Sequence, residues 1–81
     1  MLVKDLISCL EYPVDVIAIN AFDADGSELY IPFDGFESEE IPERILDSEV
    51  KSYWISFQMN HKMLCEIEVE YQLNIILDNI L

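Results

Sequence analysis

Residues 63–71, MLCEIEVEY, alternate apolar and acidic side chains almost without a break, and this pattern constrains the fold more than any other. Successive side chains of a β-strand point to opposite faces of its sheet. The alternation predicts a strand with Met63, Cys65, Ile67, Val69 and Tyr71 on its inward face and Glu66, Glu68 and Glu70 on its outward face. Because the apolar face must be covered, we expect a layer of helices on one side of the sheet.

The strand 63–71 is expected to form a hairpin with VKSYWISFQM (50–59) across a turn at 60–62. One face of the segment 50–59 carries Tyr53, Ile55 and Phe57. Trp54 lies on the other face, where we expect a C-terminal helix to cover it as part of the core. If that face is open instead, Trp54 and Tyr30 would form an aromatic anchor for a partner.

An earlier hairpin is predicted from VDVIAINAF (14–22) and SELYIPF (27–33). The segment between them, DADG (23–26), is typical of a turn, and Gly26 can adopt the positive φ that such turns require. Pro32 lacks an amide hydrogen, so the second strand is expected to lie at an edge of the sheet or to end there.

Apolar residues recur at helical spacing in two segments, Val3, Leu6, Ile7 and Leu10 near one end and Leu73, Ile76, Leu77 and Ile80 near the other. The first set predicts an amphipathic helix over about residues 2–11, which ends before Pro13. The second set predicts a C-terminal helix, with continuation as a strand as the alternative. Between the hairpins, IPERILD (41–47) predicts one helical turn with Pro42 near its start.

These elements indicate a single small α+β domain spanning residues 1–81. The expected order is an N-terminal helix, a four-stranded antiparallel meander of two hairpins with a short helical turn between them, and a C-terminal helix. The helices are expected to cover one face of the sheet and to leave the glutamate stripe exposed to water.

The net charge of −13 comes from seventeen acidic residues against four basic ones. Such a surface repels nucleic acid and anionic membranes, because phosphate binding needs clustered Lys and Arg. Direct binding to either is therefore not expected. A basic partner protein fits the charge better. The sequence also shows no signal peptide and no segment apolar and long enough to span a membrane, which favours a cytoplasmic protein.

Candidate partner-binding residues form two acidic sets. The first lies within DGFESEEIPERILDSE (34–49) and comprises Asp34, Glu37, Glu39, Glu40 and Glu43; the second is the stripe Glu66, Glu68 and Glu70. Acidic residues on this scale also serve plain solubility. However, alternating Lys and Glu would do that with less repulsion, so a second interpretation stays open beside solubility: a surface that presents carboxylates where a partner expects phosphates.

A calcium site is not expected at the turn 23–26. Asp23, Asp25 and Gly26 match positions 3, 5 and 6 of an EF-hand loop. In that alignment the first ligand position is Ala21 and the twelfth is Pro32, so two essential oxygen ligands are missing. The segment is better explained as a hairpin turn.

No catalytic constellation is present, and the sequence predicts neither an enzyme nor a cofactor or metal site. His61 is the only histidine and falls in the expected turn, and no serine lies in a nucleophile motif. Cys9 and Cys65 lack the spacing of a metal or redox motif, so we expect reduced, buried thiols.

Four segments together resemble short acidic proteins encoded by phages and prophages of Gram-positive and gut bacteria: VKDLISCL (3–10), FDADGSELY (22–30), EIPERILDSEVKS (40–52) and LCEIEV (64–69). The chain departs from that group in the PFDGFESEE segment before Ile41 and in its LNIILDNIL tail. The resemblance transfers no functional residues. It implies a small accessory protein in the cytoplasm of an infected bacterium.

Two functions follow as hypotheses. The first is an inhibitor of a host nucleic-acid-binding defence protein, such as a CRISPR or restriction component, that imitates nucleic acid with its acidic surface. The alternative is a small structural or assembly protein that oligomerises through its apolar C-terminal segment, Leu73–Leu81.

Overall fold

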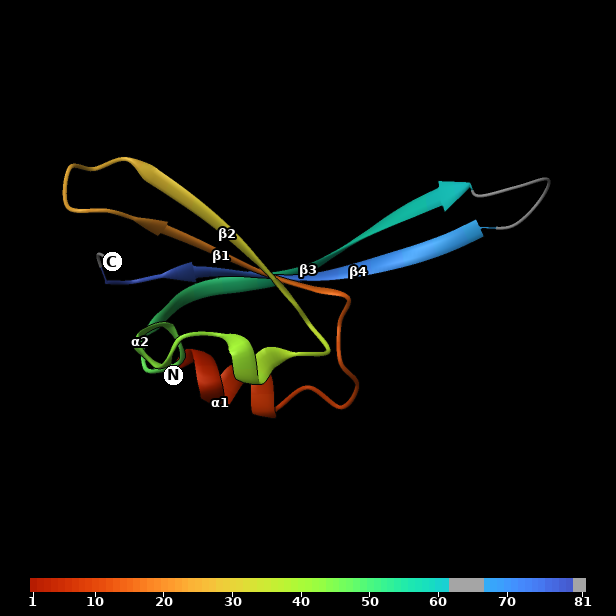
Figure 1. Cartoon of the computed structure of the whole chain (residues 1–81), viewed down its shortest axis with the longest axis horizontal. Coiled ribbons are helices and arrows are strands. Elements are labelled where there is room, and N and C mark those ends of the chain that lie inside the picture. Colours follow the sequence, from red (N-terminus) through yellow and green to blue (C-terminus); the bar gives the residue numbers. More distant parts are fainter. Residues whose placement is uncertain (62–66, 80–81) are drawn as a thin grey trace.

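The structure, a computed structural model, describes residues 1–61 and 67–79 of the chain (Figure 1). In chain order the elements are α1 (Val3–Ser8), β1 (Val16–Phe22), β2 (Glu28–Asp34), the 3₁₀ turn η1 (Ser38–Glu40), α2 (Glu43–Leu46), β3 (Val50–His61) and β4 (Ile67–Leu77). The fold is built mainly from its sheet, and its helices are short.

The four strands form one mixed sheet in the order β2-β1-β4-β3. Both hairpins pair antiparallel as expected, but β4 inserts beside β1 and runs parallel to it, with Ile17 opposite Leu73 and Ile19 opposite Ile75. The expected antiparallel meander is therefore wrong. The physical reason is that β1 and the second half of β4 are the most completely apolar strands, and pairing them places both at the centre of the sheet. The strand with Pro32 lies at an edge, as predicted.

The expected C-terminal helix is also wrong, and the alternative of a continued strand holds as far as Leu77. Leu73, Ile75 and Leu77 point to the covered face and are buried. Ile76 lies between them on the opposite face. The helical period of 3.6 residues per turn fitted only part of this segment. Pairing with a strand on each side makes it a β-strand instead. Ile80 and Leu81 lie outside the described residues.

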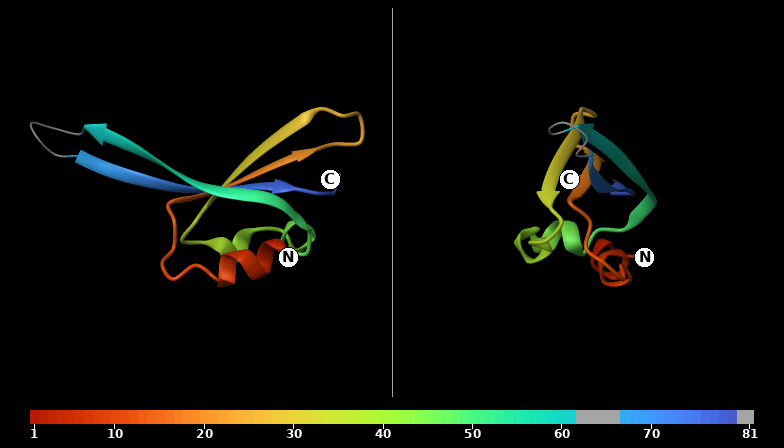
Figure 2. Two further views of the ribbon diagram at one scale, coloured as in Figure 1. Left: turned by 180° about the vertical axis from the view of Figure 1, so that it is seen from behind. Right: turned by 90° about the vertical axis from the view of Figure 1, so that its right-hand side faces the viewer.

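The three helical pieces lie together against one face of the sheet, as both views of Figure 2 show. Helix α1 is present as expected but is shorter than residues 2–11. The core between the helices and the sheet comprises Val3, Leu6, Val14, Ile17, Ile19, Ala21, Ile41, Ile45, Leu73, Ile75 and Leu77. The other face of the sheet carries no helix in the described part of the chain.

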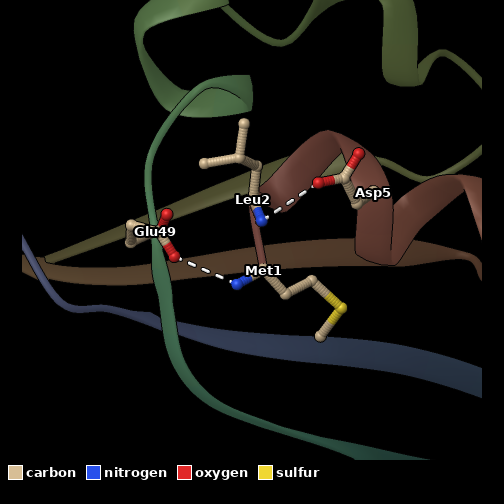
Figure 3. A network of polar contacts seen from close by, with 4 residues as sticks. All are labelled: Met1, Leu2, Asp5 and Glu49. Atoms are coloured by element: carbon tan, nitrogen blue, oxygen red, sulfur yellow. Dashed lines mark hydrogen bonds and ion pairs between the residues drawn. The ribbon is translucent and has the colours of Figure 1, made fainter.

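The start of α1 is attached to the strand that follows α2 (Figure 3). The amino group of Met1 forms an ion pair with Glu49 at 3.0 Å, and the amide of Leu2 donates to Oδ2 of Asp5 at 3.3 Å. Backbone hydrogen bonds from Val3 to Ser48 and from Val50 to Met1 complete the attachment. These contacts hold α1 beside α2 and so fix the helical layer over the sheet.

The first hairpin has the predicted turn. Gly26 adopts φ 88°, which a side chain would disfavour. Oδ1 of Asp23 accepts hydrogen bonds from the amides of Asp25 and Ser27, at 3.0 and 3.1 Å. Hydrogen bonds that the Asp25 carboxylate shares with Asp23, and then those from Ser27, lower the pKa of Asp25 to about 2. Both carboxylates therefore serve the turn, which confirms the hairpin interpretation.

Two residues hold the far end of β2 against the start of β1. Gly35 is buried and donates its amide to the carbonyl of Asp15 at 3.0 Å. Asp15 also donates its own amide to the carbonyl of Tyr71, and its Oδ2 accepts from the amide of Tyr71 at 2.7 Å. This junction marks the point where β4 leaves β1.

Beyond the junction, the second hairpin continues as a two-stranded arm that projects away from the helices (Figures 1 and 2). We define the arm as residues 57–61 of β3 and 67–71 of β4. Within the described strands these residues pair with each other, and Tyr71 at the base of the arm also bonds to Asp15. Because Asn60 and His61 belong to β3, the turn expected at 60–62 is wrong at these two positions, and Lys62 lies outside the described residues.

The inward face predicted for 63–71 alternates as expected, but its described residues are not buried. Ile67, Val69 and Tyr71 share one face of the arm and are exposed. Met63 and Cys65 lie outside the described residues. The alternation therefore predicted correctly which side chains share a face. The expected layer of helices over that face is wrong for the arm, because the helical layer ends before it.

Candidate functional site

The first acidic set forms a continuous exposed surface, here called the acidic ledge. It consists of Asp34, Glu37, Glu39, Glu40 and Glu43, all of them exposed. The ledge runs from the end of β2 through η1 to the start of α2. Ile41 and Ile45 lie beneath it at 2% and 1% exposure, so the acids stand on a segment that is attached to the core. The predicted helical turn is confirmed as α2, with Pro42 as its N-cap.

Like charges on the ledge act on one another. Repulsion from Glu40, and then from Asp34, raises the pKa of Glu37 above its ordinary value of 4.5. The folded chain therefore holds this proton more tightly than the unfolded chain does. Stability is gained below the ordinary value and lost as the pH rises through the raised pKa. At neutral pH the fold therefore keeps these carboxylates close together despite their mutual repulsion.

The described basic residues do little to offset this charge. In residues 1–61 and 67–79 the ion pairs are Met1 with Glu49 and Lys4 with Asp47, the latter at 2.9 Å. Neither pair includes an acid of the ledge. The hydrogen bond and the ion pair with Asp47 are the main causes that raise the pKa of Lys4. Attraction to Glu43 of the ledge makes only a minor contribution to this shift. A cation from outside the chain would therefore find Glu37, Glu39 and Glu40 available.

The second acidic set lies elsewhere. Glu68 and Glu70 point to the helix-free face of the arm, opposite Asn60 and Gln58 of β3. Glu66 lies outside the described residues. Since the ledge lies in the helical layer, the two sets are on opposite sides of the sheet, and the structure does not bring them into one surface.

A row of polar side chains crosses the helix-free face of the sheet. Nε2 of Gln72 donates to Oδ1 of Asn74 at 2.7 Å and to the hydroxyl of Tyr30 at 3.3 Å. Nδ2 of Asn74 donates to the hydroxyl of Ser56 at 2.9 Å. The row links β2, β4 and β3, and it explains why Asn74 can be buried at the centre of the sheet.

An aromatic hollow of about 380 Å³ lies beside this row on the helix-free face. Its lining residues are Asn20, Ala21, Phe22, Glu28, Leu29, Tyr30, Trp54 and Ile76. Trp54 is 48% exposed and Tyr30 57%, so the expectation that a helix covers Trp54 is wrong. The alternative, an open face with Trp54 and Tyr30 available to a partner, describes the structure. Glu28 gives the hollow an acidic group at one end.

The second hairpin carries, along the arm and at its base, an exposed apolar surface that the sequence did not reveal. We call it the arm face: Tyr53, Ile55, Phe57, Met59, Ile67, Val69 and Tyr71, which share one side of the second hairpin and are 38–65% exposed. It continues directly from Leu73 and Ile75, which the helices cover. One signal in the sequence could have indicated this exposed surface. The alternating segment is long, and the chain has few helical residues that could cover its apolar face.

Neither metal nor membrane chemistry gains support from the described residues. Within residues 1–61 and 67–79 no three His, Cys, Asp or Glu side chains gather as a metal site. Among the same residues no helix is both long and apolar enough to cross a bilayer. Cys9 is exposed, so its expected burial is wrong, and Cys65 lies outside the described part of the chain.

Comparison of the chain with protein-family models, with curated proteins and with solved structures finds no match.

Proposed function

We propose that this protein is a non-enzymatic inhibitor that docks its acidic ledge on the basic, nucleic-acid-binding surface of a partner protein. The observation that carries the proposal is the set of exposed carboxylates of Glu37, Glu39 and Glu40, which are attached to the core and form no ion pair with a basic residue of the described chain. A basic partner supplies the charge that the chain itself lacks.

Binding of a basic partner would relieve repulsion between the carboxylates of the ledge. Repulsion that raises the pKa of Glu37 is present in the free protein, and a Lys or Arg of the partner would replace it with attraction. Because the ledge is held by buried Ile41 and Ile45, little ordering of this segment is needed on binding. The net charge of −13 adds long-range attraction, which accelerates encounter with a basic surface and is weakened by salt.

The partner class follows from the same chemistry. A surface that binds nucleic acid is lined by Lys and Arg, and carboxylates on a rigid surface compete for those groups with phosphates. The resemblance to small phage-encoded proteins favours a host defence protein of the CRISPR or restriction type. Such an inhibitor acts by occupying the site and needs no catalytic residue.

Affinity capture from a bacterial lysate tests the proposal. The tagged chain and the variant Glu37→Lys/Glu39→Lys/Glu40→Lys are used as baits, and each is eluted with increasing salt. We expect the variant to lose its nucleic-acid-binding partner at least about tenfold, because the partner's cations then meet like charge. The partner should also elute from the unmodified bait as salt screens the contact.

A matched control separates the ledge from bulk charge. The variant Glu11→Lys/Glu28→Lys/Asp78→Lys changes the net charge by the same amount at exposed positions that are not part of the ledge. It should retain most of the captured partner. Equal loss from both variants, or retention by both with folded structure shown by circular dichroism, would contradict the role of the ledge.

Assembly is the second candidate, and one observation favours it. The C-terminal segment first proposed for oligomerisation cannot serve as a free surface through Leu73, Ile75 and Leu77, because they are buried in the core. The exposed arm face offers a different apolar surface for contact between copies.

A further inference from the structure

Nothing in residues 1–61 and 67–79 covers the apolar arm face. Phe57 and Tyr71 pair across the two strands, as do Met59 and Val69, and each pair places its side chains on the same side of the arm. Phe57 and Met59 are 65% and 60% exposed. The molecule measures 47 × 28 × 20 Å, and the arm extends along its longest axis beyond the helices (Figure 1).

Its area is that of an interface. With about 150–250 Å² for a fully exposed large side chain, the seven side chains together expose an area on the order of 700 Å². The largest apolar patch on a typical monomer is about 300–600 Å². A standard protein interface buries about 800 Å² on each partner. The arm face lies near the upper end of the first range or above it, and it approaches the area that one partner of a standard interface buries.

The arm also needs support. A two-stranded hairpin alone in water is marginally stable, and stability comes from a third strand or from packing of its apolar face. Apart from the hydrogen bonds between Tyr71 and Asp15, residues 57–61 and 67–71 have neither within the described chain, whereas the neighbouring residues Leu73 and Ile75 have both. A partner that packs on the arm face would bury its apolar side chains, as the helical layer does for the rest of the sheet.

The charge pattern identifies the partner. Over residues 53–59 and 67–71 the arm face carries no charged side chain, and Glu68 and Glu70 alternate onto the opposite side. A basic partner is drawn to the ledge and gains no ion pair here. A second copy brings an equally neutral surface of the same area.

We propose that the chain forms a symmetric dimer in which the arm faces of two copies pack against each other. A two-fold axis makes this contact self-complementary, and packed sheets lie about 10 Å apart. The glutamates of both arms then point outward into solvent. This proposal is independent of the ledge as a binding site.

Salt distinguishes the two proposals. Two copies of charge −13 repel each other, while the contact itself is apolar, so screening should strengthen the dimer several-fold between low and high ionic strength. A complex of the ledge with a basic protein responds in the opposite direction. The opposite responses to salt therefore allow the dimer and the binding of a basic partner to be tested separately.

Sedimentation equilibrium of the purified chain at low and high salt tests the dimer. We expect a mass that approaches twice 9.4 kDa with rising concentration, and tighter association at high salt. A mass of one chain at every concentration and salt would overturn the proposal, whatever any variant does.

The variant Phe57→Glu places a charge at the centre of the arm face, at a residue that packs little in the monomer. It should weaken association at least about tenfold, because an unpaired charge is then buried in the contact. Phe36→Glu is the matched control, since Phe36 is 63% exposed and lies outside the arm face. It should dimerise as the unmodified chain does. A dimer that persists equally in Phe57→Glu would place the contact elsewhere, for example at an outer strand edge, and would also overturn the proposal.

Discussion

Replacing Gly35 by alanine is expected to destabilise the fold by about 3 kcal/mol or more. A Cβ at this position would lie 1.8 Å from the carbonyl oxygen of Val14 and 2.7 Å from its carbonyl carbon. Both are backbone atoms, so no side-chain rotation can relieve the contact. The chain would have to move Gly35 away and lose its hydrogen bond to the carbonyl of Asp15.

The loss is a large share of the total stability, which for a chain of this length is about 4–12 kcal/mol. Urea denaturation followed by circular dichroism measures it. Gly26→Ala is the matched control, because Gly26 has φ +88° but an alanine Cβ there would meet no heavy atom within 4 Å. That variant should lose only about 1–2 kcal/mol through backbone strain. Equal costs for the two variants would contradict the close approach at Gly35.

Replacing Ile75 by alanine is expected to cost about 2–5 kcal/mol, because a fully buried side chain is removed from the centre of the core. Ile75 is 0% exposed and lies opposite Ile19 of β1 and Tyr53 of β3. Ile76→Ala should cost much less, since Ile76 is only half-buried and faces the aromatic hollow.

The comparison of these two neighbours decides between strand and helix at the C-terminus. Helical spacing groups Ile76 with Leu73 and Leu77, whereas the strand groups Ile75 with them. Thermal or urea unfolding of both variants gives the answer. A larger loss for Ile76→Ala than for Ile75→Ala would contradict the position of β4 in the sheet.

Local signals predicted local structure well. Asp23 and Gly26 specify the first turn through short-range hydrogen bonds and backbone conformation, which neighbours along the chain determine. Pro32 lies in an edge strand because it lacks a donor. The helical turn predicted from IPERILD (41–47) is likewise a local signal, and α2 forms within this segment.

The order of strands could not be predicted in the same way. Pairing of β1 with β4 joins residues more than fifty positions apart, such as Ile19 and Ile75, and no local pattern encodes it. The segment 73–77 fits both a helix and a strand, and the sheet on either side of it decides between them. Asp-Gly at 34–35 marks a turn in the sequence but does not show which part of the backbone Gly35 will contact.

The acidic ledge was visible in the sequence as exposed charge, but the separation of Glu68 and Glu70 from it was not, since that depends on which face the helices cover. The arm face was missed for the same reason. Alternation at Ile67, Val69 and Tyr71 predicts an apolar face, and only the extent of the helical layer shows that the described part of the chain leaves this face exposed.

Displacement of nucleic acid from the captured partner tests the proposed inhibition most directly. The fluorescence anisotropy of a labelled oligonucleotide bound to that partner is followed while the chain is added at low salt. We expect full displacement at about one chain per binding site, and none by the Glu37→Lys/Glu39→Lys/Glu40→Lys variant. A partner that holds the oligonucleotide and the chain at the same time would contradict the account.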